Sequence, residues 1–180
     1  IWGEESDDVL EAAYLNSYYQ TGLKNLLDVA VLEHAEVHRE LDPAANFRKV
    51  DEIPFDFQRR RMSVVVAEHD AHHLLICKGA VEEILSICQR VRHGEADEPL
   101  TPELLAQIRR VTADLNEDGL RVVAVAASSA SAVGIDRGET EFSDMGLVSR
   151  TSCRSVGEQL HVTKLGRGCG FALGMCSVGG

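Results

Sequence analysis

Apolar residues recur at helical spacing in two segments near the start of the chain. The segment from Ser6 to Tyr19 opens with Ser-Asp-Asp, which favours a helix start, and then repeats apolar residues along one helical face. The segment from Leu23 to His38 places leucine, alanine and valine at i, i+3, i+4, i+7 and i+8. Each segment therefore predicts one amphipathic helix, and Asp42-Pro43 ends the helical part of the pattern.

The pattern then changes to that of extended strands. Residues Phe47 to Phe57 indicate one strand, in which Pro54 suits an edge or entry position. The segments Met62 to Glu68 and Leu74 to Lys78 are apolar and rich in β-branched residues, and a short polar link joins them. So short a link predicts an antiparallel hairpin.

Two more helices and a strand are expected further on. Ala80 to Val91 shows helical spacing, and Thr101-Pro102 is typical of a helix start, with the helix running to Asn116 and Gly119 closing it. Leu120 to Ala126 has the composition of a buried strand. The order α, α, β, β-hairpin, α, α, β predicts an α+β fold: a mainly antiparallel sheet flanked by helices.

The last part of the chain has a different texture. Residues 127–180 hold ten of the 15 glycines, a Ser/Ala run and no sustained period. We therefore expect one domain over residues 1–126, with about residue 148 as its outer limit, and a Gly/Ser-rich divergent tail over 127–180 that is poorly ordered or not native-like.

Composition narrows the function classes. The 180 residues are 44% hydrophobic and 26% charged, as in ordinary globular domains, and no apolar run approaches the ~18 residues of a membrane span. A net charge of −11 argues against nucleic-acid binding. Five cysteines without a CxxC pair favour reduced thiols in the cytosol. The chain begins at Ile1 without a signal-peptide pattern, so we expect a piece of a longer protein.

Three short motifs concentrate residues suited to an anionic aromatic ligand. Phe55 precedes the arginine run 59–61, and together they offer a stacking face and positive charge. Lys78-Gly79 lies at a strand-to-helix junction, where a ligand can approach the backbone, and Arg121 opens the last predicted strand. Each has a plainer interpretation when taken singly, namely a solvated charge run, an exposed lysine or an edge arginine.

In combination the motifs resemble the nucleotide-binding domain of P-type ATPases, most closely that of the bacterial magnesium-transporting subgroup. They occur in the order of that family and span most of residues 6–126. The segments that carry the resemblance are Leu15-Asn16-Ser17, Gln20-Thr21-Gly22-Leu23-Lys24-Asn25-Leu26-Leu27-Asp28, Asp51 to Phe57, Arg60 to Val66, Lys78-Gly79-Ala80 and Gly119 to Ala126.

The resemblance implies roles for residues of this chain. Phe55 resembles the aromatic residue on which adenine stacks, and Lys78 the lysine deep in the nucleotide pocket. Arg60 and Arg121 match the basic residues near the phosphates. Gly79 and Ala80 would let the nucleotide lie close to the backbone.

One position departs from the family. In many P-type ATPases an acidic residue on the second helix faces the adenine, and the alignment places Lys24 there. Asp28, one turn later, is the candidate substitute, so it joins the predicted nucleotide-binding residues.

The resemblance also implies a function: the cytosolic ATP-binding domain of a magnesium-transporting P-type ATPase, at the cytoplasmic side of the bacterial inner membrane. Such a domain holds ATP, with Mg²⁺, and presents its γ-phosphate to the aspartate of a separate phosphorylation domain of the same polypeptide. The Asp-Lys-Thr-Gly-Thr and Gly-Asp-Gly motifs of that other domain do not occur in this sequence. We therefore expect a fragment that binds nucleotide without hydrolysis, with no catalytic residue, metal site, nucleic-acid partner or direct membrane contact of its own.

Two alternatives stay open. One is a stand-alone nucleotide-sensing or interaction module derived from the same fold. The other is a metal site at His69, His72 and His73, although a polar turn is the simpler interpretation of these histidines. A shift of the melting temperature by ATP or by a transition metal distinguishes the two kinds of ligand.

Overall fold

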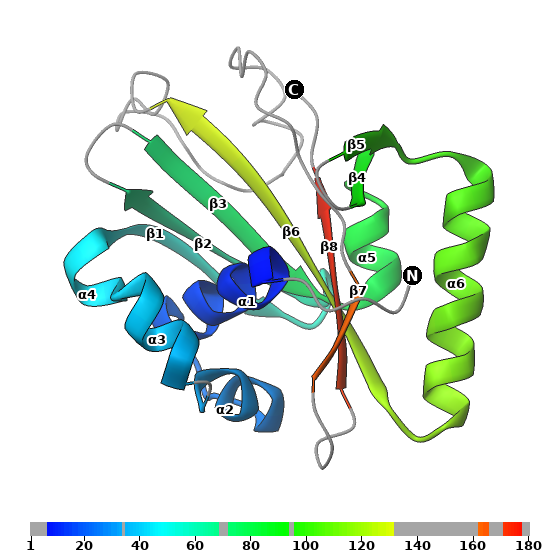
Figure 1. Ribbon diagram of the computed structural model, residues 1–180, viewed down its shortest axis with the longest axis horizontal. Coiled ribbons are helices and arrows are strands. Elements are labelled where there is room, and N and C mark those ends of the chain that lie inside the picture. Colours follow the sequence, from blue (N-terminus) through cyan, green and yellow to red (C-terminus); the bar gives the residue numbers. More distant parts are fainter. Residues whose placement is uncertain are drawn as a thin grey trace.

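The computed structural model describes residues 7–33, 35–68, 72–93, 96–131, 162–165 and 171–177 (Figure 1). Its helices are α1 (Asp7–Tyr19), α2 (Leu26–Leu32), α3 (Ala35–Leu41), α4 (Pro43–Asn46), α5 (Val81–Leu85) and α6 (Pro102–Glu117). Its strands are β1 (Phe47–Asp56), β2 (Arg61–Glu68), β3 (His72–Gly79), β4 (Arg90–His93), β5 (Ala96–Pro99), β6 (Arg121–Ser131), β7 (Val162–Leu165) and β8 (Phe171–Ser177).

The strands form one eight-stranded sheet in the order β1-β2-β3-β6-β8-β4-β5, with β7 paired to β8. Strands β6 and β8 are parallel, and the other pairings among the described strands are antiparallel. The predicted hairpin is present as β2 and β3, whose register runs from Arg61 opposite Gly79 to Glu68 opposite His72. The expected α+β fold on a mainly antiparallel sheet is therefore confirmed.

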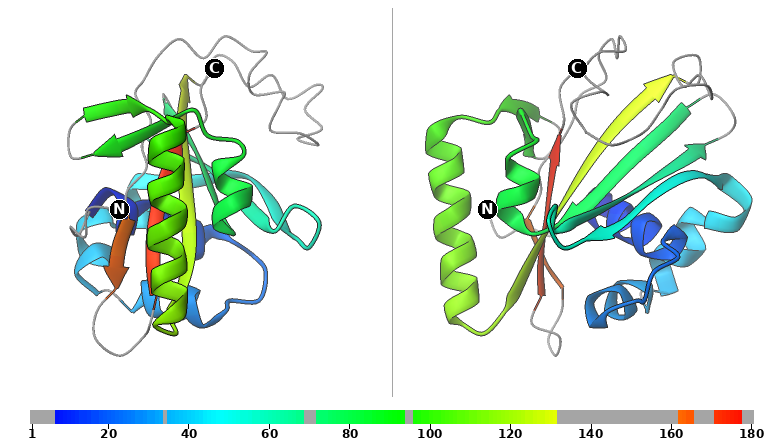
Figure 2. Two further views of the ribbon diagram at one scale, coloured as in Figure 1. Left: turned by 90° about the vertical axis from the view of Figure 1, so that its right-hand side faces the viewer. Right: turned by 180° about the vertical axis from the view of Figure 1, so that it is seen from behind.

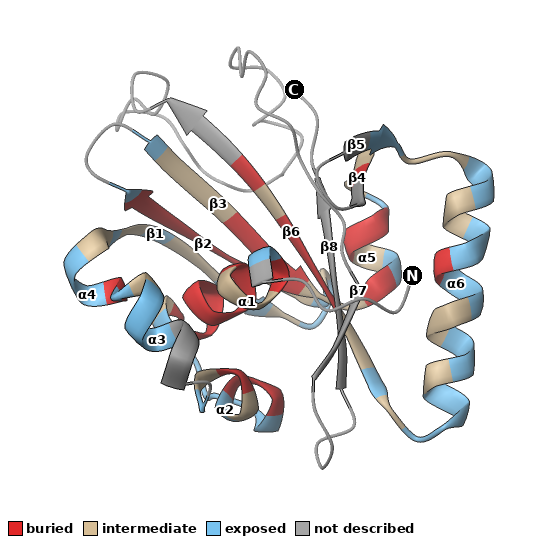
Figure 3. Ribbon diagram, in the orientation of Figure 1, coloured by how far each residue is buried: buried red, intermediate tan, exposed pale blue. Residues whose placement is uncertain are grey.

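Helices cover both faces of the sheet. Figures 1 and 2 show α1 to α4 on one side and α5 and α6 on the other. Neighbouring residues of β3 belong to opposite layers, because Ile76 packs with α1 and α2, whereas Cys77 packs with α5 and α6. This explains why residues 63–67 of β2 are buried without interruption. Figure 3 shows burial concentrated in α1, α5 and the middle strands, while α6 exposes most of its outer surface.

Two predicted helices match the structure closely. Helix α1 occupies the first predicted segment almost from end to end. Helix α6 begins after Thr101, whose hydroxyl accepts a hydrogen bond from the Leu104 amide at 3.3 Å. It ends at Glu117, and Gly119 then adopts φ +82°, the left-handed conformation that favours glycine after a helix.

The prediction of one helix from Leu23 to His38 is wrong. Helix α2 begins only at Leu26, because Asn25 and Asp28 form a capping box that fixes the helix start there. Leu23 lies outside the helix and is fully exposed, and Leu26 is 80% exposed. The apolar spacing therefore placed exposed leucines on the expected buried face. The chain forms two shorter helices here, α2 and α3.

The prediction of a helix from Ala80 to Val91 is also wrong in its length. Helix α5 covers Val81–Leu85, and the amides of Ile87 and Cys88 donate to carbonyls three residues back, which tightens the chain and ends the helix. Val91 then lies in β4, buried beneath α5 and α6. The β-branched side chain of Val91 favours a strand, although its spacing from the preceding apolar residues also fits a helix.

One expectation concerns the cysteines. Cys77 is a buried free thiol, but Cys88 takes part in a disulfide, which corrects the expectation of reduced thiols.

Another expectation concerns the tail. Within residues 127–180 the structure describes the end of β6 together with β7 and β8. The remainder of the predicted tail lies outside the described residues, so the proposed division of the chain stays a prediction.

Candidate functional site

A cavity of about 490 Å³ lies where β3 ends and β6 begins, between the start of α2 and the helices α5 and α6. Residues from each of these elements, and from the β1–β2 connection, form its walls. They are Asn25, Leu27, Phe55, Arg60, Met62, Lys78, Gly79, Ala80, Val81, Glu82, Glu83, Thr112, Asn116, Arg121, Val122 and Val123.

The cavity brings together most of the residues singled out from the sequence. Its walls include the aromatic residue, the three cations and the Gly-Ala pair predicted to contact nucleotide. These are Phe55, Arg60, Lys78, Gly79, Ala80 and Arg121. Asp28 is not a lining residue, and neither is Lys24. The positions fit the predicted set, while the binding roles themselves stay predictions.

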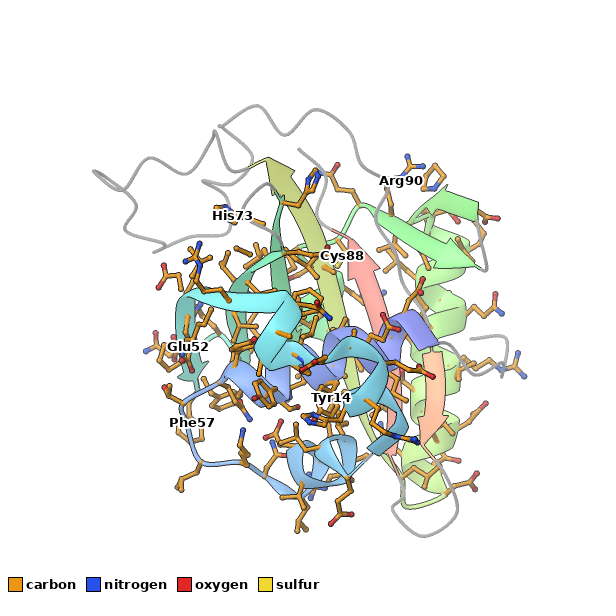
Figure 4. All side chains as sticks on the ribbon, turned by 60° about the vertical axis from the view of Figure 1, so that its left-hand side comes forward. Tyr14, Glu52, Phe57, His73, Cys88 and Arg90 are labelled. Carbon is orange, nitrogen blue, oxygen red and sulfur yellow. The ribbon has the colours of Figure 1, made fainter. Side chains whose placement is uncertain are left out.

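Phe55 forms the aromatic wall near the end of β1. Its side chain is 45% exposed and meets Phe57 edge to face, with ring centroids 5.3 Å apart. Phe57 is 88% exposed and does not line the cavity. Figure 4 places Phe57 and Glu52 at the same outer edge of the molecule. Leaving a large aromatic surface uncovered is unfavourable in water, and Phe55 combines that exposure with a place in a cavity wall.

Lys78 belongs to the floor of the cavity and is only 4% exposed. Its ammonium group donates a hydrogen bond to the Ser17 hydroxyl at 2.7 Å and forms an ion pair with the Asp28 carboxylate. Ser17 also donates to the same Asp28 oxygen, at 2.9 Å. A charge is retained in the interior when it is paired and hydrogen-bonded, and both conditions are met here.

Burial and pairing act in opposite directions on this pair. Burial lowers the pKa of Lys78, because the ammonium loses hydration, and the charge of Lys24 adds to this effect against the attraction of Asp28. Burial alone would raise the pKa of Asp28. The positive charge of Lys78, its hydrogen bond and the hydrogen bond from the Asn25 amide lower this pKa by more than burial raises it. The pKa of Asp28 therefore lies below its ordinary value, and its carboxylate stays ionised.

Gly79 is required by the protein's own packing. A Cβ atom at this position would lie 2.5 Å from both the Arg60 carbonyl oxygen and the Arg61 Cβ. The next amide, that of Ala80, donates to the Arg60 carbonyl at 3.0 Å. The glycine therefore lets the end of β3 pack against the start of β2, and the Ala80 amide is already occupied within the protein.

Arg60 lies at the rim of the cavity. Its guanidinium is 61% exposed and pairs with Glu83 of α5 at 2.8 Å. Its backbone has φ 48°, a left-handed conformation that a non-glycine residue seldom adopts. On the same side, Glu82 pairs with Arg109 of α6 at 2.9 Å, so each lining carboxylate has an arginine partner.

The β6 side of the cavity carries Arg121 at the start of the strand, with an exposed side chain that makes no ion pair to another described residue. Thr112 and Asn116 of α6 lie one helical turn apart and line the wall beside it. The sequence reasoning did not select these two polar residues, although i, i+4 spacing on the helix preceding Arg121 was the available signal.

At the start of α2, neither Lys24 nor Asp28 lines the cavity. Lys24 donates a hydrogen bond to the Ser17 carbonyl, and Asp28 is buried beneath Lys78. Asn25 and Leu27 are the residues of this segment that line the cavity. The carboxylate proposed as a substitute adenine contact therefore lies behind the wall.

Two of the histidines predicted at a turn, His72 and His73, lie far from this cavity. His72 and His73 begin β3, the strand whose other end carries Lys78, and Figure 4 shows His73 well away from Phe57. His69 lies outside the described residues. Within the part of the chain that the structure describes, no three His, Cys, Asp or Glu side chains are grouped as a metal site requires.

Comparison with known proteins gives a consistent result. Residues 5–153 match the family described as P-type ATPase, cytoplasmic domain N. The magnesium-transporting ATPase, P-type 1, of Escherichia coli (strain K12) is 53% identical over 145 residues, which are 81% of this chain and 16% of that protein. Its counterpart in Salmonella typhimurium (strain LT2) is 56% identical over 126 residues, 70% of this chain and 14% of that protein.

A more distant relative is the calcium-transporting ATPase 1 of Schizosaccharomyces pombe, 31% identical over 102 residues, or 56% of this chain and 11% of that protein. This chain is thus similar to a small part of each relative. The helices that the structure describes are all too short or too polar to span a lipid bilayer.

Proposed function

Because the chain belongs to the family of the P-type ATPase cytoplasmic domain N, we propose that it binds ATP in the cavity between Phe55, Lys78 and Arg121. Adenine stacks on Phe55, and the triphosphate lies toward the three cations. The domain then presents the γ-phosphate to an aspartate on a separate phosphorylation domain of a longer polypeptide. Alone, it binds nucleotide without hydrolysing it.

The combination of ring and cations in one cavity carries this proposal. The chain has a net charge of −11, yet Arg60, Lys78 and Arg121 converge on a space of about 490 Å³ that an uncovered aromatic ring also borders. A purine base with phosphates uses both features: stacking contributes about 1–3 kcal/mol per base, and cations attract the phosphates.

The wider role is proposed by analogy with the magnesium-transporting relatives. We propose that the domain serves a magnesium-transporting pump at the cytoplasmic side of a bacterial inner membrane, with ATP hydrolysis completed by the other domains of that pump. Glu82 and Glu83, the carboxylates that line the cavity, are paired with arginines, so Mg²⁺ is proposed to arrive coordinated by the triphosphate. A stand-alone nucleotide-sensing module would share the cavity and differ in lacking that phosphorylation partner.

An NMR titration of the 180-residue chain with ATP tests the proposal, with Phe55→Ala and Phe57→Ala as matched variants. Saturable shifts around the cavity are expected, and Phe55→Ala should raise the Kd about tenfold through lost stacking. Phe57→Ala removes an equally large exposed ring outside the cavity and should change the Kd by less than about threefold.

Two outcomes contradict the proposal: a folded spectrum without saturable shifts, or equal losses in the two variants. Phosphate release in the presence of this chain should be no faster than the spontaneous hydrolysis of ATP in buffer. Release above that rate would contradict the assignment of chemistry to another domain.

A further inference from the structure

We propose that Asp28 is a positioning residue for Lys78: it holds the ammonium on the cavity floor for the triphosphate and makes no contact with the adenine. The inference rests on the proposed function, because it assigns Asp28 a role in the same site. It replaces the role of adenine contact that the resemblance suggested for this carboxylate.

The contacts of Asp28 leave it no path to a ligand. Its side chain is 0% exposed, and Ser17, which also bonds to it, is 0% exposed. One carboxylate oxygen accepts from Lys78 and Ser17, and the other accepts from the Asn25 amide at 2.9 Å. A base could reach this carboxylate only if some of the groups bonded to it moved aside.

The same contacts direct Lys78 toward the cavity. An ammonium group has three N–H donors, and Asp28 and Ser17 occupy two of them. No third partner occurs among the described residues, and Lys78 lines the cavity. The remaining donor is therefore available to a phosphate oxygen, with the direction of the side chain fixed from behind.

Asp28 also keeps Lys78 charged. Burial lowers the pKa of Lys78, and Asp28 is the group that opposes this. The other charged groups around Lys78 come from several elements: Lys24 before α2, Arg60 before β2, Glu82 and Glu83 on α5, and Arg121 on β6. Both glutamates are already paired with arginines, so neither replaces the Asp28 charge.

Replacing Asp28 by asparagine keeps the shape, removes the counter-charge and puts an NH2 donor in place of one of the two accepting oxygens. Lys78 should then lose its proton at a lower pH, and ATP affinity should fall as that proton leaves. Relative to the unaltered chain at the same pH, the Kd for ATP should rise about tenfold near pH 9 and by much less near pH 6. Taking the ratio at each pH cancels the titration of ATP itself.

The experiment measures ATP and adenosine binding by NMR between about pH 6 and about pH 9, for the unaltered chain, Asp28→Asn, Lys78→Met and the surface control Asp114→Asn. Asp114 is exposed on α6 and absent from the cavity walls, so its substitution makes the same charge change elsewhere. Adenosine binding should be nearly equal in all four proteins. The ATP loss of Asp28→Asn should approach that of Lys78→Met as pH rises.

Equal weakening of ATP and adenosine in Asp28→Asn, without pH dependence, would overturn the inference in favour of adenine contact. If Asp28→Asn does not fold, the ¹⁵N signal of the Lys78 ammonium in the unaltered chain decides: it should shift with ATP and not with adenosine, and no shift with ATP overturns the inference. Failure of the unaltered chain to bind ATP at all would instead reject the proposed function.

Discussion

The floor and the rim of the cavity each carry an ion pair, and the two pairs differ in almost every physical respect. On the floor, Lys78 and Asp28 are 4% and 0% exposed and share hydrogen bonds with Ser17 and Asn25. At the rim, Arg60 is 61% exposed, and its partner Glu83 is 22% exposed. Water screens the exposed rim pair far more strongly than the buried floor pair. The floor therefore fixes a charge in place, whereas the rim can exchange its partner for a ligand.

The largest expected effect comes from breaking the floor pair. Lys78→Met leaves the Asp28 carboxylate buried without a counter-charge and should lower the free energy of unfolding by about 3–5 kcal/mol. Urea denaturation measures the loss. Adding Asp28→Leu to Lys78→Met removes the stranded charge and should recover part of the stability. If the double variant lost as much free energy of unfolding as the two single variants lose together, this account of the floor pair would be refuted.

Acid should weaken the same pair. The pKa of Asp28 lies below its ordinary value of 3.8, so its contribution to stability is complete above that value and disappears as pH falls through the lower, folded-state pKa. The stability difference between the unaltered chain and Asp28→Asn should shrink on acidification from neutral pH. A difference that stays constant in urea titrations down to about pH 2 would exclude this linkage.

A smaller effect is expected where floor and rim meet. Gly79→Ala places a Cβ 2.5 Å from the Arg60 carbonyl oxygen and the Arg61 Cβ, so the β2–β3 contact must shift, at about 1–3 kcal/mol. Gly22→Ala is the matched control, because nothing lies within 4 Å of its added Cβ. Thermal unfolding should show a lower Tm for the first variant and an unchanged or slightly higher Tm for the second.

The smallest effect is expected at the rim. Glu83→Gln should change stability by less than about 1 kcal/mol, because its partner Arg60 is mostly exposed. By releasing Arg60 it should tighten ATP binding about twofold to threefold at low salt. Glu82→Gln removes an equal charge but releases Arg109, which lies outside the cavity walls. Equal tightening in both variants would show that the net charge matters rather than Arg60.

Local signals in the sequence were enough to predict α1, the β2–β3 hairpin and α6. In each case the spacing of apolar residues, the helix-capping residues and the length of the connections agree with the tertiary structure. The predictions were wrong where these local signals disagree with the tertiary structure. Spacing alone extended a helix back to Leu23, whereas the Asn25–Asp28 capping box starts it at Leu26. In the same way, Val91 continued a helical pattern but belongs to a strand.

The cavity was predictable in part for a similar reason. Phe55, Lys78 and Arg121 each lie beside a strand end that local pattern identifies, and the sheet brings those ends together. The pairing of Lys78 with Asp28 joins residues 50 positions apart. A single sequence shows that a buried lysine needs a counter-charge, but it does not show which carboxylate provides it. The same holds for Thr112 and Asn116, whose role depends on how α6 packs.

The left-handed backbone at Arg60 sets a limit on engineering this domain. Holding a non-glycine residue at φ 48° costs about 1 kcal/mol, and glycine or asparagine would adopt that conformation more readily. Laboratory evolution that rewards thermostability alone would therefore tend to replace Arg60, and it would remove a cavity cation without disturbing the fold. Libraries built on this scaffold should keep position 60 fixed, or should select for ligand retention alongside stability.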